Sequence, residues 1–396
     1  MEDTTAALRA AEELVEALKK CKTPSPAEHL DLLARTNKVR MALEQPYDII
    51  TRQHGTILVA GAMYSLIGTG AIQKIPSEGS ISASELAAAV NANISTITRL
   101  MRVAICNGIF EETAPDVYSH NSISQSYQLN ALGGFFLICM DFNKAYLALP
   151  DYLKSHTPED LFDDKKSPFA YAFGKEGSDY YEVLNEDIEK RNIWNGTMQA
   201  MEKNMPISGM FPFASLKEQV EREPERAFFV DVAGGRGQAL LKLQEDIPGT
   251  FGGKLILQDL PIVIDSLKPE DVPNIETMKY DIFTPQPVKN AHVYFMRRLL
   301  HDFYNPVCVE ILKSTVQSMG PDSRLIICDM LVPDKVEVNG PTELYWLDLN
   351  LMMISGKEKT LKEFHELLDA AGLELVKVWP SAIGATVQLE TRLKRS

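Results

Sequence analysis

Two different hydrophobic periodicities divide this chain near residue 226. Before that point apolar positions recur at helical spacing, as in the series Leu8, Val15 and Leu18. After it, short apolar runs of strand length alternate with longer amphipathic segments. Alternating β and α segments are typical of an α/β protein in which helices cover a parallel, doubly wound sheet. The pattern therefore predicts a helix-rich N-terminal half and an α/β C-terminal half.

Seven strand candidates follow the change of period. They are 228–233, 254–259, 275–280, 292–297, 324–330, 373–379 and 385–393. The last two come directly after a helical segment, 361–372, with no helix-length segment between them. We therefore expect these two strands to form an antiparallel pair at the edge of the sheet. A seven-stranded sheet with this ending is a Rossmann-like arrangement.

A winged-helix pattern lies within the N-terminal half. Ser82 and Glu85 have the spacing of a helix-capping box, and two short helices are separated by a turn at 91–93. A β-hairpin is expected around Pro115–Asp116. Helix, turn, helix and hairpin is the order of a winged helix, which can bind DNA or serve as a dimerisation module.

The charge balance favours the dimerisation module. The 40 Lys and Arg residues against 54 Asp and Glu residues give a net charge of −14. Nucleic-acid binders usually carry a basic surface, and the candidate recognition helix offers only Arg99 and Arg102. Nucleic acid is therefore not an expected partner, although a non-enzymatic winged-helix regulator stays as one alternative function.

The remaining composition predicts a cytoplasmic protein that is not embedded in a membrane. The apolar stretch 46–72 is interrupted by glycines and polar residues, which favours a buried pair of helices over a membrane span. The first twenty residues form a charged amphipathic helix pattern rather than a signal peptide. The cysteines are odd in number and dispersed, which suits free thiols in a reducing compartment, and no metal-ligand spacing occurs. They are Cys21, Cys106, Cys139, Cys308 and Cys328.

These patterns suggest three regions. Residues 1–130 would form a helical, winged-helix dimerisation domain, and 226–396 the Rossmann-like domain. Between them, 131–225 would be a helical connector that contributes to a substrate pocket. Two domains are also what a chain of 396 residues is expected to need.

A glycine-rich turn after the first strand indicates a cofactor site. The strand runs into Gly234-Gly235-Arg236-Gly237, and glycines allow the backbone to approach a ligand closely at a helix N-terminus. The spacing differs from that of dinucleotide binders, because Leu240 stands where their third glycine would be. Asp231 precedes the glycines; its carboxylate would repel a pyrophosphate and attract an ammonium or sulfonium group.

Two more acids follow at the ends of the next strands. Asp259, followed by Leu260, ends the second strand, where a carboxylate suits ribose hydroxyl groups. Asp281 follows the third strand beside the apolar Ile282, a combination suited to adenine. Ribose and adenine contacts together with Asp231 in place of a phosphate cradle predict S-adenosylmethionine as the cofactor.

A candidate general base follows the fourth strand. His301 lies just past the strand end, Asp329 ends the fifth strand, and Glu358 lies in a loop before the next helix. Imidazole has an ordinary pKa of about 6.5, and a carboxylate can fix its tautomer and stabilise its protonated form. A phenol becomes a good nucleophile when such a base removes its proton. These residues therefore predict methyl transfer to a hydroxyl group.

The assembled motifs resemble those of the plant and fungal small-molecule O-methyltransferases of the caffeate type, over nearly the whole chain. The motifs are VDVAGGRG, LILQDLP, YDIFTPQP, FMRRLLHDF and SGKEKT. The resemblance implies an intertwined homodimer, His301 as the base flanked by Asp329 and Glu358, and a set of cofactor contacts. The contacts that it implies are Gly235, Asp259, Asp281, Ile282, Arg297 and Phe303.

The chain also departs from the family pattern. Ala233 stands where a third glycine is more usual, Asp329 is shorter than the common glutamate, and Phe303 replaces a tryptophan. Some fungal proteins of this fold bind the cofactor but catalyse dehydration and pericyclic ring closure, and a pericyclase is therefore the enzymatic alternative. The expected substrate is a small aromatic or polyketide-derived molecule. Candidate pocket residues are Phe136, Met140, Trp194, Met198, Trp346 and Met353.

Overall fold

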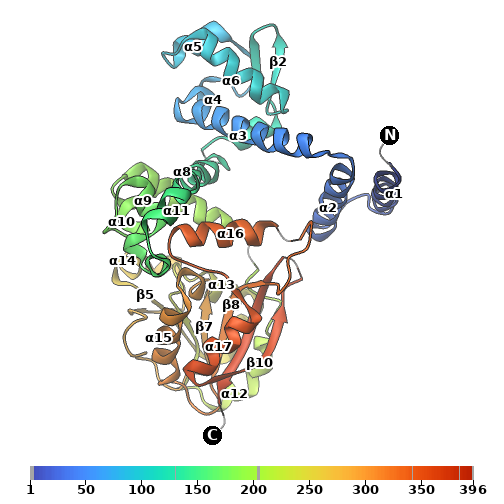
Figure 1. The fold of residues 1–396 in the computed structure, drawn as a ribbon. Helices are drawn as coiled ribbons and strands as arrows, with labels where there is room; N and C mark the ends of the chain where they lie inside the picture. The colour runs from blue at the N-terminus through green and yellow to red at the C-terminus, as the bar shows by residue number, and fades with distance from the viewer. Residues whose placement is uncertain (1–3, 130, 203–205, 341, 383, 395–396) are drawn as a thin grey trace. The chain divides into compact units, whose positions relative to one another are not determined.

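The chain folds into two compact units that are interleaved along the sequence (Figure 1). The computed structural model describes residues 4–129, 131–202, 206–340, 342–382 and 384–394. Unit 1 comprises Met1–Lys154 and Tyr171–Asn204, and unit 2 comprises Ser155–Ala170 and Met205–Ser396. The stretch 131–225, predicted to be a connector, contributes to both units. Its part in a substrate pocket stays a prediction.

Unit 1 contains the predicted winged helix. Helices α5 (Ala83–Ala89) and α6 (Ile94–Cys106) are followed by the hairpin β2 (Phe110–Ala114) and β3 (Val117–His120), and β1 (Ile81–Ser82) pairs with β3. The Ser82 hydroxyl accepts a hydrogen bond from the Glu85 amide at 3.3 Å, while the Ser82 amide donates to the Glu85 carboxylate at 3.0 Å. The capping box therefore starts α5, and the helix–turn–helix–hairpin order is confirmed.

The apolar stretch 46–72 is mostly one helix, so the expectation of a buried helix pair was wrong. Helix α3 spans Pro46–Gly68 and is followed only by the short α4 (Ala71–Lys74). Its C-terminal part is buried, whereas five large apolar side chains in its N-terminal part are exposed. They are Tyr47, Ile49, Ile50, Ile57 and Leu58. Glycines inside a continuous helix cost stability but do not by themselves break it, and no described helix combines the length and apolar character that a membrane span requires.

The other helices of unit 1 form an N-terminal hairpin and a second cluster. In the hairpin, Lys38 forms an ion pair with Glu13 at 2.8 Å. In the second cluster, Tyr180 packs edge-to-face against Trp194, and Lys190 forms an ion pair with Asp141 at 2.8 Å. The hairpin consists of α1 (Thr5–Lys20) and α2 (Pro26–Leu43), and the second cluster includes α8 (Gly133–Ser155), α10 (Tyr180–Asn185) and α11 (Ile188–Glu202). The short α7 (Ser122–Ser126) contacts β3, and the division of the chain into units falls within α9 (Pro168–Phe173).

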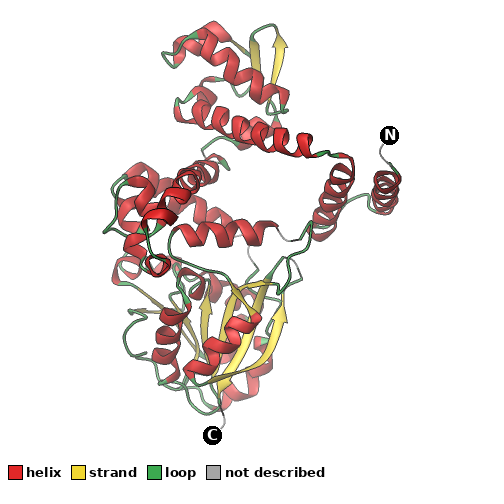
Figure 2. Cartoon of the chain, viewed as in Figure 1, coloured by secondary structure: helices red, strands yellow, loops and turns green. Residues whose placement is uncertain are grey.

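Unit 2 is built on a mainly parallel sheet (Figure 2), which confirms the predicted fold class. The strand order is β10-β11-β8-β7-β4-β5-β6, and only β11 runs against its neighbours. The predicted antiparallel ending is therefore present. The strands are β4 (Ala227–Val232), β5 (Lys254–Asp259), β6 (Glu276–Lys279), β7 (Val293–Arg297), β8 (Arg324–Val332), β10 (Leu373–Pro380) and β11 (Thr386–Leu393), and the two-residue β9 (Lys359–Thr360) pairs with β8.

Side chains from the central strands fill two cores, one on each face of the sheet. In β4, Val230 packs into the core that includes α15 (Asn305–Val316) and α17 (Leu361–Ala371), whereas Phe229 packs into the core with α12 (Lys217–Arg222) and α13 (Gln238–Asp246). Such alternation follows from the two-residue period of a strand. Because both faces are covered, the central strands consist mainly of apolar residues, as buried parallel strands usually do, and Asp231, Gln258 and Asp329 are buried exceptions. Helices α14 (Pro261–Ile264) and α16 (Thr342–Met353) complete the unit.

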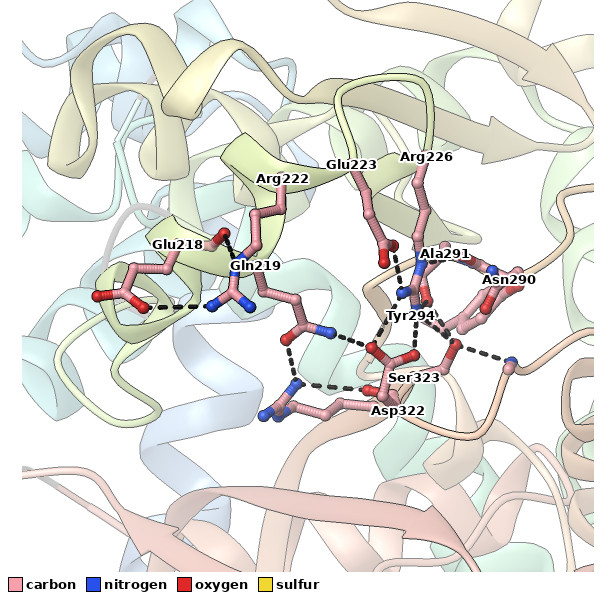
Figure 3. Close-up of polar contacts among 12 residues, drawn as sticks. Glu218, Gln219, Arg222, Glu223, Arg226, Asn290, Ala291, Tyr294, Asp322 and Ser323 are labelled. Atoms are coloured by element: carbon pink, nitrogen blue, oxygen red, sulfur yellow. Dashed lines mark hydrogen bonds and ion pairs between the residues drawn. The ribbon is translucent and has the colours of Figure 1, made fainter.

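A buried arginine ties together three strand beginnings at the amino end of the sheet (Figure 3). The Arg226 guanidinium, whose side chain is 8% exposed, forms ion pairs with Asp322 at 2.7 Å and with Glu223 at 2.8 Å. It also donates to the Ala291 carbonyl at 3.3 Å. Arg226 precedes β4, Ala291 precedes β7, and Asp322 precedes β8. This contact therefore fixes the strands at the end of the sheet opposite the glycine-rich turn.

Replacing this arginine is expected to destabilise the protein without changing cofactor affinity. Arg226→Met should lower the free energy of unfolding by about 2 kcal/mol, less than for a fully buried ion pair because both carboxylates are about half exposed. Urea denaturation would measure the loss. Arg222→Met is the matched control, since that side chain is 75% exposed and contacts only Glu218 in the hydrogen-bond network drawn. Equal stability of the two variants would contradict the expectation.

Candidate active site

The glycine-rich turn after β4 has the close packing that a ligand cradle requires. Ala233, Gly235 and Gly237 have φ angles of 55°, 60° and 80°, in the left-handed region. Gly234 is required for a different reason, because a Cβ there would lie 2.4 Å from the Asp231 carboxylate and 2.6 Å from Leu257. The backbone of the turn is thus packed closely against the buried side chain of Asp231. Ala233 adopts the left-handed conformation despite its Cβ, and the departure from glycine is therefore tolerated.

Asp259 joins this turn to the end of β5. Its carboxylate accepts hydrogen bonds from the Gly235 amide at 2.8 Å and from the Leu260 amide at 2.7 Å. Burial raises the pKa of Asp259, and the two amides partly offset that rise. The structure therefore brings together four of the predicted cofactor residues, Asp231, Gly235, Asp259 and Leu260. Gly237 begins helix α13, next to them in the chain.

The loop after β6 carries Asp281 and two aromatic rings. The Asp281 carboxylate accepts a hydrogen bond from the Phe283 amide at 3.0 Å. Phe283 is half exposed and packs edge-to-face against Phe303, with ring centroids 5.8 Å apart. This places Phe303 beside the Asp281 loop, as an adenine-contacting ring would need. Phe283 was not among the predicted site residues, although it follows Ile282 in the quoted motif.

A buried pair of amides connects this loop to β5. Gln258 and Gln286 exchange two hydrogen bonds of 2.8 Å, and neither side chain is exposed. Gln258 immediately precedes Asp259, and Gln286 closes the loop that begins at Asp281. The pair therefore fixes the spacing of the two acids. The sequence offered no signal for it, because a glutamine in a strand gives no sign of its distant partner.

His301 lies in a single 3-10 turn, Leu300–Asp302, after β7, and its side chain is buried. Its Nδ1 is 2.8 Å from the Glu358 carboxylate, and its Nε2 is 3.5 Å from the Asp302 carboxylate. An ionised Glu358 holds the proton on Nδ1, and Nε2 is then the basic nitrogen. The predicted pairing of His301 with Glu358 is present in the structure. Asp302, whose carboxylate is the nearest to Nε2, was not among the predicted site residues, because the sequence does not show the orientation of the His301 ring.

Burial dominates the protonation of this cluster. It lowers the pKa of His301, although Asp302 opposes the change, and it raises the pKa of Glu358 to about 7. The imidazole is thus neutral near pH 7, as a general base must be. Glu358 is ionised above that pH, where it can stabilise a protonated imidazole. We therefore expect the cluster to be a competent base at neutral to mildly alkaline pH.

Asp329 lies in the same buried region without a direct contact to His301. Among the described residues, neither carboxylate oxygen has a hydrogen-bond partner, and burial raises the pKa of Asp329 to about 7. The side chain borders a cavity of about 10 Å³ that is also lined by Arg297 and Thr386. A cavity of this size holds about one water molecule. Asp329 is thus buried near His301 without a hydrogen bond to it, and its predicted flanking role stays a prediction.

The six candidate pocket residues are divided between the two units. Phe136, Met140, Trp194 and Met198 are partly buried in unit 1. In α16 of unit 2, Trp346 is partly buried, whereas Met353 is fully buried in the core. The fully buried Met353 is therefore better explained by core packing. The assignment of a substrate pocket to this set stays a prediction.

Comparison with known proteins identifies the family that uses this arrangement. Residues 151–374 match the O-methyltransferase domain family, and residues 62–137 match the O-methyltransferase dimerisation domain. The chain belongs to the O-methyltransferase family. The glycine-rich turn, the acids that follow it and His301 all lie within the first match.

Individual relatives of this O-methyltransferase agree over nearly its full length. It is 36% identical to O-methyltransferase hmp5 of Hypomyces subiculosus over 97% of each chain, and 32% identical to O-methyltransferase afvC of Aspergillus flavus over 89% of this chain and 84% of that one. The crystal structure of OxaC covers 98% of this chain and 99% of its own, with a TM-score of 0.84 and 27% identity. A pericyclic reaction enzyme shares the fold, with a TM-score of 0.80 at 24% identity over 99% of this chain and 100% of its own.

The family membership confirms the predicted enzyme class. The chain is an S-adenosylmethionine-dependent O-methyltransferase, and the residues of unit 2 fit that cofactor. The fit rests on a turn that has no room for a Cβ at Gly234 and on a carboxylate, Asp259, that is fixed by two amides of the same region. The roles of individual residues are proposals.

Asp329 provides a test of the electrostatics that does not depend on the reaction. Its pKa of about 7 lies above the ordinary value of about 3.9, so its stabilising contribution is complete below pH ~4 and is lost as the pH rises to 7. Asp329→Asn should therefore be more stable than the natural protein above pH 7, by roughly 1–3 kcal/mol, and similar to it near pH 4. Thermal melting across this range would measure the difference. Asp334→Asn, in the exposed segment after β8, is the control and should show no such trend.

Proposed function

We propose that this O-methyltransferase methylates a hydroxyl group of an aromatic or polyketide-derived small molecule, with His301 as the general base. The observation that carries the proposal is the 2.8 Å contact between His301 Nδ1 and the Glu358 carboxylate in a buried site. That contact leaves Nε2 as the basic nitrogen. A phenolic or enolic hydroxyl is the acceptor whose reactivity depends most on such a base, because its ordinary pKa of about 10 keeps it protonated at neutral pH.

In the proposed reaction His301 moves one proton. Its Nε2 accepts the hydroxyl proton of the substrate, and the resulting imidazolium is stabilised by Glu358 at Nδ1 and by Asp302 at 3.5 Å from Nε2. The bound cofactor supplies an electrophilic methyl group attached to a positively charged sulfur. After transfer, the proton leaves His301 to solvent, which restores the neutral base. General-base catalysis of this kind contributes a rate factor of about 10²–10⁴.

The cofactor would be held by residues at the carboxyl ends of the first three strands. Asp259 would accept the ribose hydroxyls, and Asp281 with Ile282 and Phe303 would contact the adenine. Asp231, beneath the glycine turn, and Gly235 would lie at the methionine part, where a carboxylate suits positive charge. Leu260, Gly237 and Arg297 complete the proposed set. The support is that the hydrogen bonds of Asp259 and the packing of Phe303 already bring these segments together.

Incubation with methyl-labelled S-adenosylmethionine and a panel of phenols and enols tests the proposal. We expect label in an ether product and formation of S-adenosylhomocysteine in equal amount. Absence of both from a broad panel, in a preparation that binds S-adenosylhomocysteine, would contradict the assignment.

Pericyclic ring closure with dehydration is the second candidate, because Asp329 supplies what that reaction needs. A carboxyl group with a pKa of about 7 is partly protonated at neutral pH and can donate a proton to a departing hydroxyl. The likeness to the pericyclic reaction enzyme is one of fold. Conversion of an unsaturated alcohol with S-adenosylhomocysteine in place of the cofactor would support this candidate, since no methyl group is then available.

The protein is also proposed to act as a homodimer. The match of 62–137 to a dimerisation domain supports this, as does the exposed apolar side of α3, formed by Tyr47, Ile50, Ile57 and Leu58. Large apolar side chains that are exposed together on one side of a helix are typical of an interface. Light scattering should give about 88 kDa, twice the chain mass of 44.2 kDa. An Ile50→Asp/Ile57→Asp variant should give about half of that value.

The cytoplasm is the proposed location. All five cysteines are free thiols in the structure, and two of them, Cys308 and Cys328, are buried in the fold. A protein that needs no disulfide suits a reducing compartment. Cell fractionation of a tagged protein would test the location, and recovery only in a secreted fraction would contradict it. No nucleic acid or membrane partner is proposed.

A further inference from the structure

A buried lysine, Lys359, lies next to the turn and the loop that carry His301 and Glu358. Lys359 is 1% exposed, and its ammonium group donates hydrogen bonds to the carbonyls of Leu300 at 2.7 Å, Phe303 at 2.9 Å and Lys357 at 2.9 Å. All three donor positions of the ammonium are thus used by backbone carbonyls. Within the described chain, no carboxylate lies within ion-pair distance of it. Burying a charge in this way is costly and requires complete hydrogen bonding.

The three carbonyls belong to the two segments that carry the proposed base and its partner. Leu300 and Phe303 flank His301, and Lys357 precedes Glu358. Lys359 itself is fixed by β9, which pairs with β8 opposite Leu331. The ammonium therefore ties the His301 turn and the Glu358 loop to the end of a central strand.

Apart from the His301–Glu358 pair, the other close contacts between these two segments are uncharged. The Lys357 amide donates to the His301 carbonyl at 2.8 Å, and a Cβ on Gly356 would lie 2.7 Å from that same oxygen. The Cys308 thiol also donates to the Leu300 carbonyl, at 3.2 Å. These contacts set the approach of the segments. Lys359 is the one member of this group that adds both hydrogen bonds and positive charge.

That positive charge acts on every acid around His301. The imidazole is faced by Asp302 from its own turn, Arg298 from the end of β7, Asp329 from β8, and Glu358 and Lys359 from the following loop and β9. Burial has the largest influence on the pKa of both His301 and Glu358. Arg298 and, less strongly, Lys359 lower both pKa values by their charge, while Asp348 of α16 raises that of Glu358. The charge of Lys359 therefore contributes to a neutral base beside an ionised partner.

We propose that Lys359 is a positioning residue that holds His301 and Glu358 in hydrogen-bonding register and keeps the pair in its neutral-imidazole, ionised-carboxylate form. The inference rests on the proposed function, in which His301 is the general base. It deepens that function by naming a residue that positions the base and its carboxylate partner.

Histidine NMR on the full-length protein tests this without any acceptor substrate. Ring ¹⁵N-labelled protein would be compared with the Lys359→Met, Lys359→Gln and Lys359→Arg variants, and His301 would be assigned from the signal lost in His301→Asn. In the natural protein we expect a slowly exchanging Nδ1 proton and a low pKa. In Lys359→Met the protected proton should be lost and the pKa of His301 should rise by about one pH unit.

The other variants separate the two parts of the role. Lys359→Gln keeps donors but no charge, so the protected proton should be retained while the pKa rises; Lys359→Arg should restore both properties. Lys362→Met on α17, where the side chain is 82% exposed, is the matched control and should change neither. If Lys359→Met does not bind S-adenosylhomocysteine, that variant is not correctly folded, and the proposal is then tested on Lys359→Gln.

An unchanged proton signal and pKa in both folded neutral variants would overturn the proposal. Absence of methyl transfer to any acceptor would remove the proposed function but leave this NMR result standing, so the two failures are distinguishable.

Discussion

Replacing His301 with asparagine is expected to lower the rate of methyl transfer by about 10²–10⁴-fold, the usual contribution of a positioned general base. Asparagine keeps a side chain that can donate to Glu358 but has no nitrogen able to accept a proton. Cofactor affinity should change little, because His301 itself makes none of the proposed cofactor contacts, although Arg297 and Phe303 of the same segment do. The measurements are single-turnover rates with a labelled cofactor and calorimetry with S-adenosylhomocysteine.

The pH dependence of this reaction distinguishes a base from a merely structural histidine. In the natural protein the rate should fall as the pH drops below about 7, where Glu358 becomes protonated. A variant without the base should lose the change in rate near pH 7, and its rate should instead rise with pH up to the substrate's own pKa of about 10, because ionised substrate then limits the reaction. His365→Asn, at an exposed position of α17, is the matched control and should keep the natural rate. A His301→Asn enzyme with the natural rate and pH profile would show that the base is elsewhere.

The α/β half of the molecule was predictable because its signals are local. Strand β5 has the predicted bounds, 254–259, since a continuous apolar run ends at a charged residue and a Leu-Pro pair. The capping box at Ser82 and the hairpin turn at Asp116 were equally local. Parallel strands place their carboxyl ends at one edge, and the sequence therefore predicts Asp259 and the glycine turn as parts of one cofactor site.

The features that the sequence did not reveal are those that depend on distant partners. Lys359 reads as one more charged residue in a polar loop, and only the fold brings Leu300 and Phe303 to its ammonium group. The proximity of Asp302 to Nε2 likewise depends on the orientation of the His301 ring, which only the fold determines. The expectation of a buried helix pair at α3 was wrong because apolar composition does not distinguish helices that fill a core from a helix whose apolar side chains are partly exposed.

Gly234→Ala is expected to have the largest effect on cofactor binding. The added Cβ would lie 2.4 Å from the Asp231 carboxylate and 2.6 Å from Leu257, far inside contact distance, and both neighbours are buried. Relief requires the turn to move away from β4 and β5, which would break the 2.8 Å hydrogen bond from the Gly235 amide to Asp259. Overpacking of this kind costs roughly 1–3 kcal/mol of stability. Because the same movement displaces the proposed ribose contact, affinity for S-adenosylhomocysteine should fall about 100-fold, or about 2.7 kcal/mol.

The matched control for this variant is Gly68→Ala in α3. Gly68 is helical and exposed, and a Cβ there would meet nothing within 4 Å. That substitution should leave cofactor affinity unchanged and should raise stability slightly, since alanine is the better helix former. Calorimetry and thermal melting on both proteins separate a local effect on the turn from a general effect of adding a methyl group. A Gly234→Ala protein with the natural affinity would mean that the cofactor does not depend on the contact between this turn and Asp259.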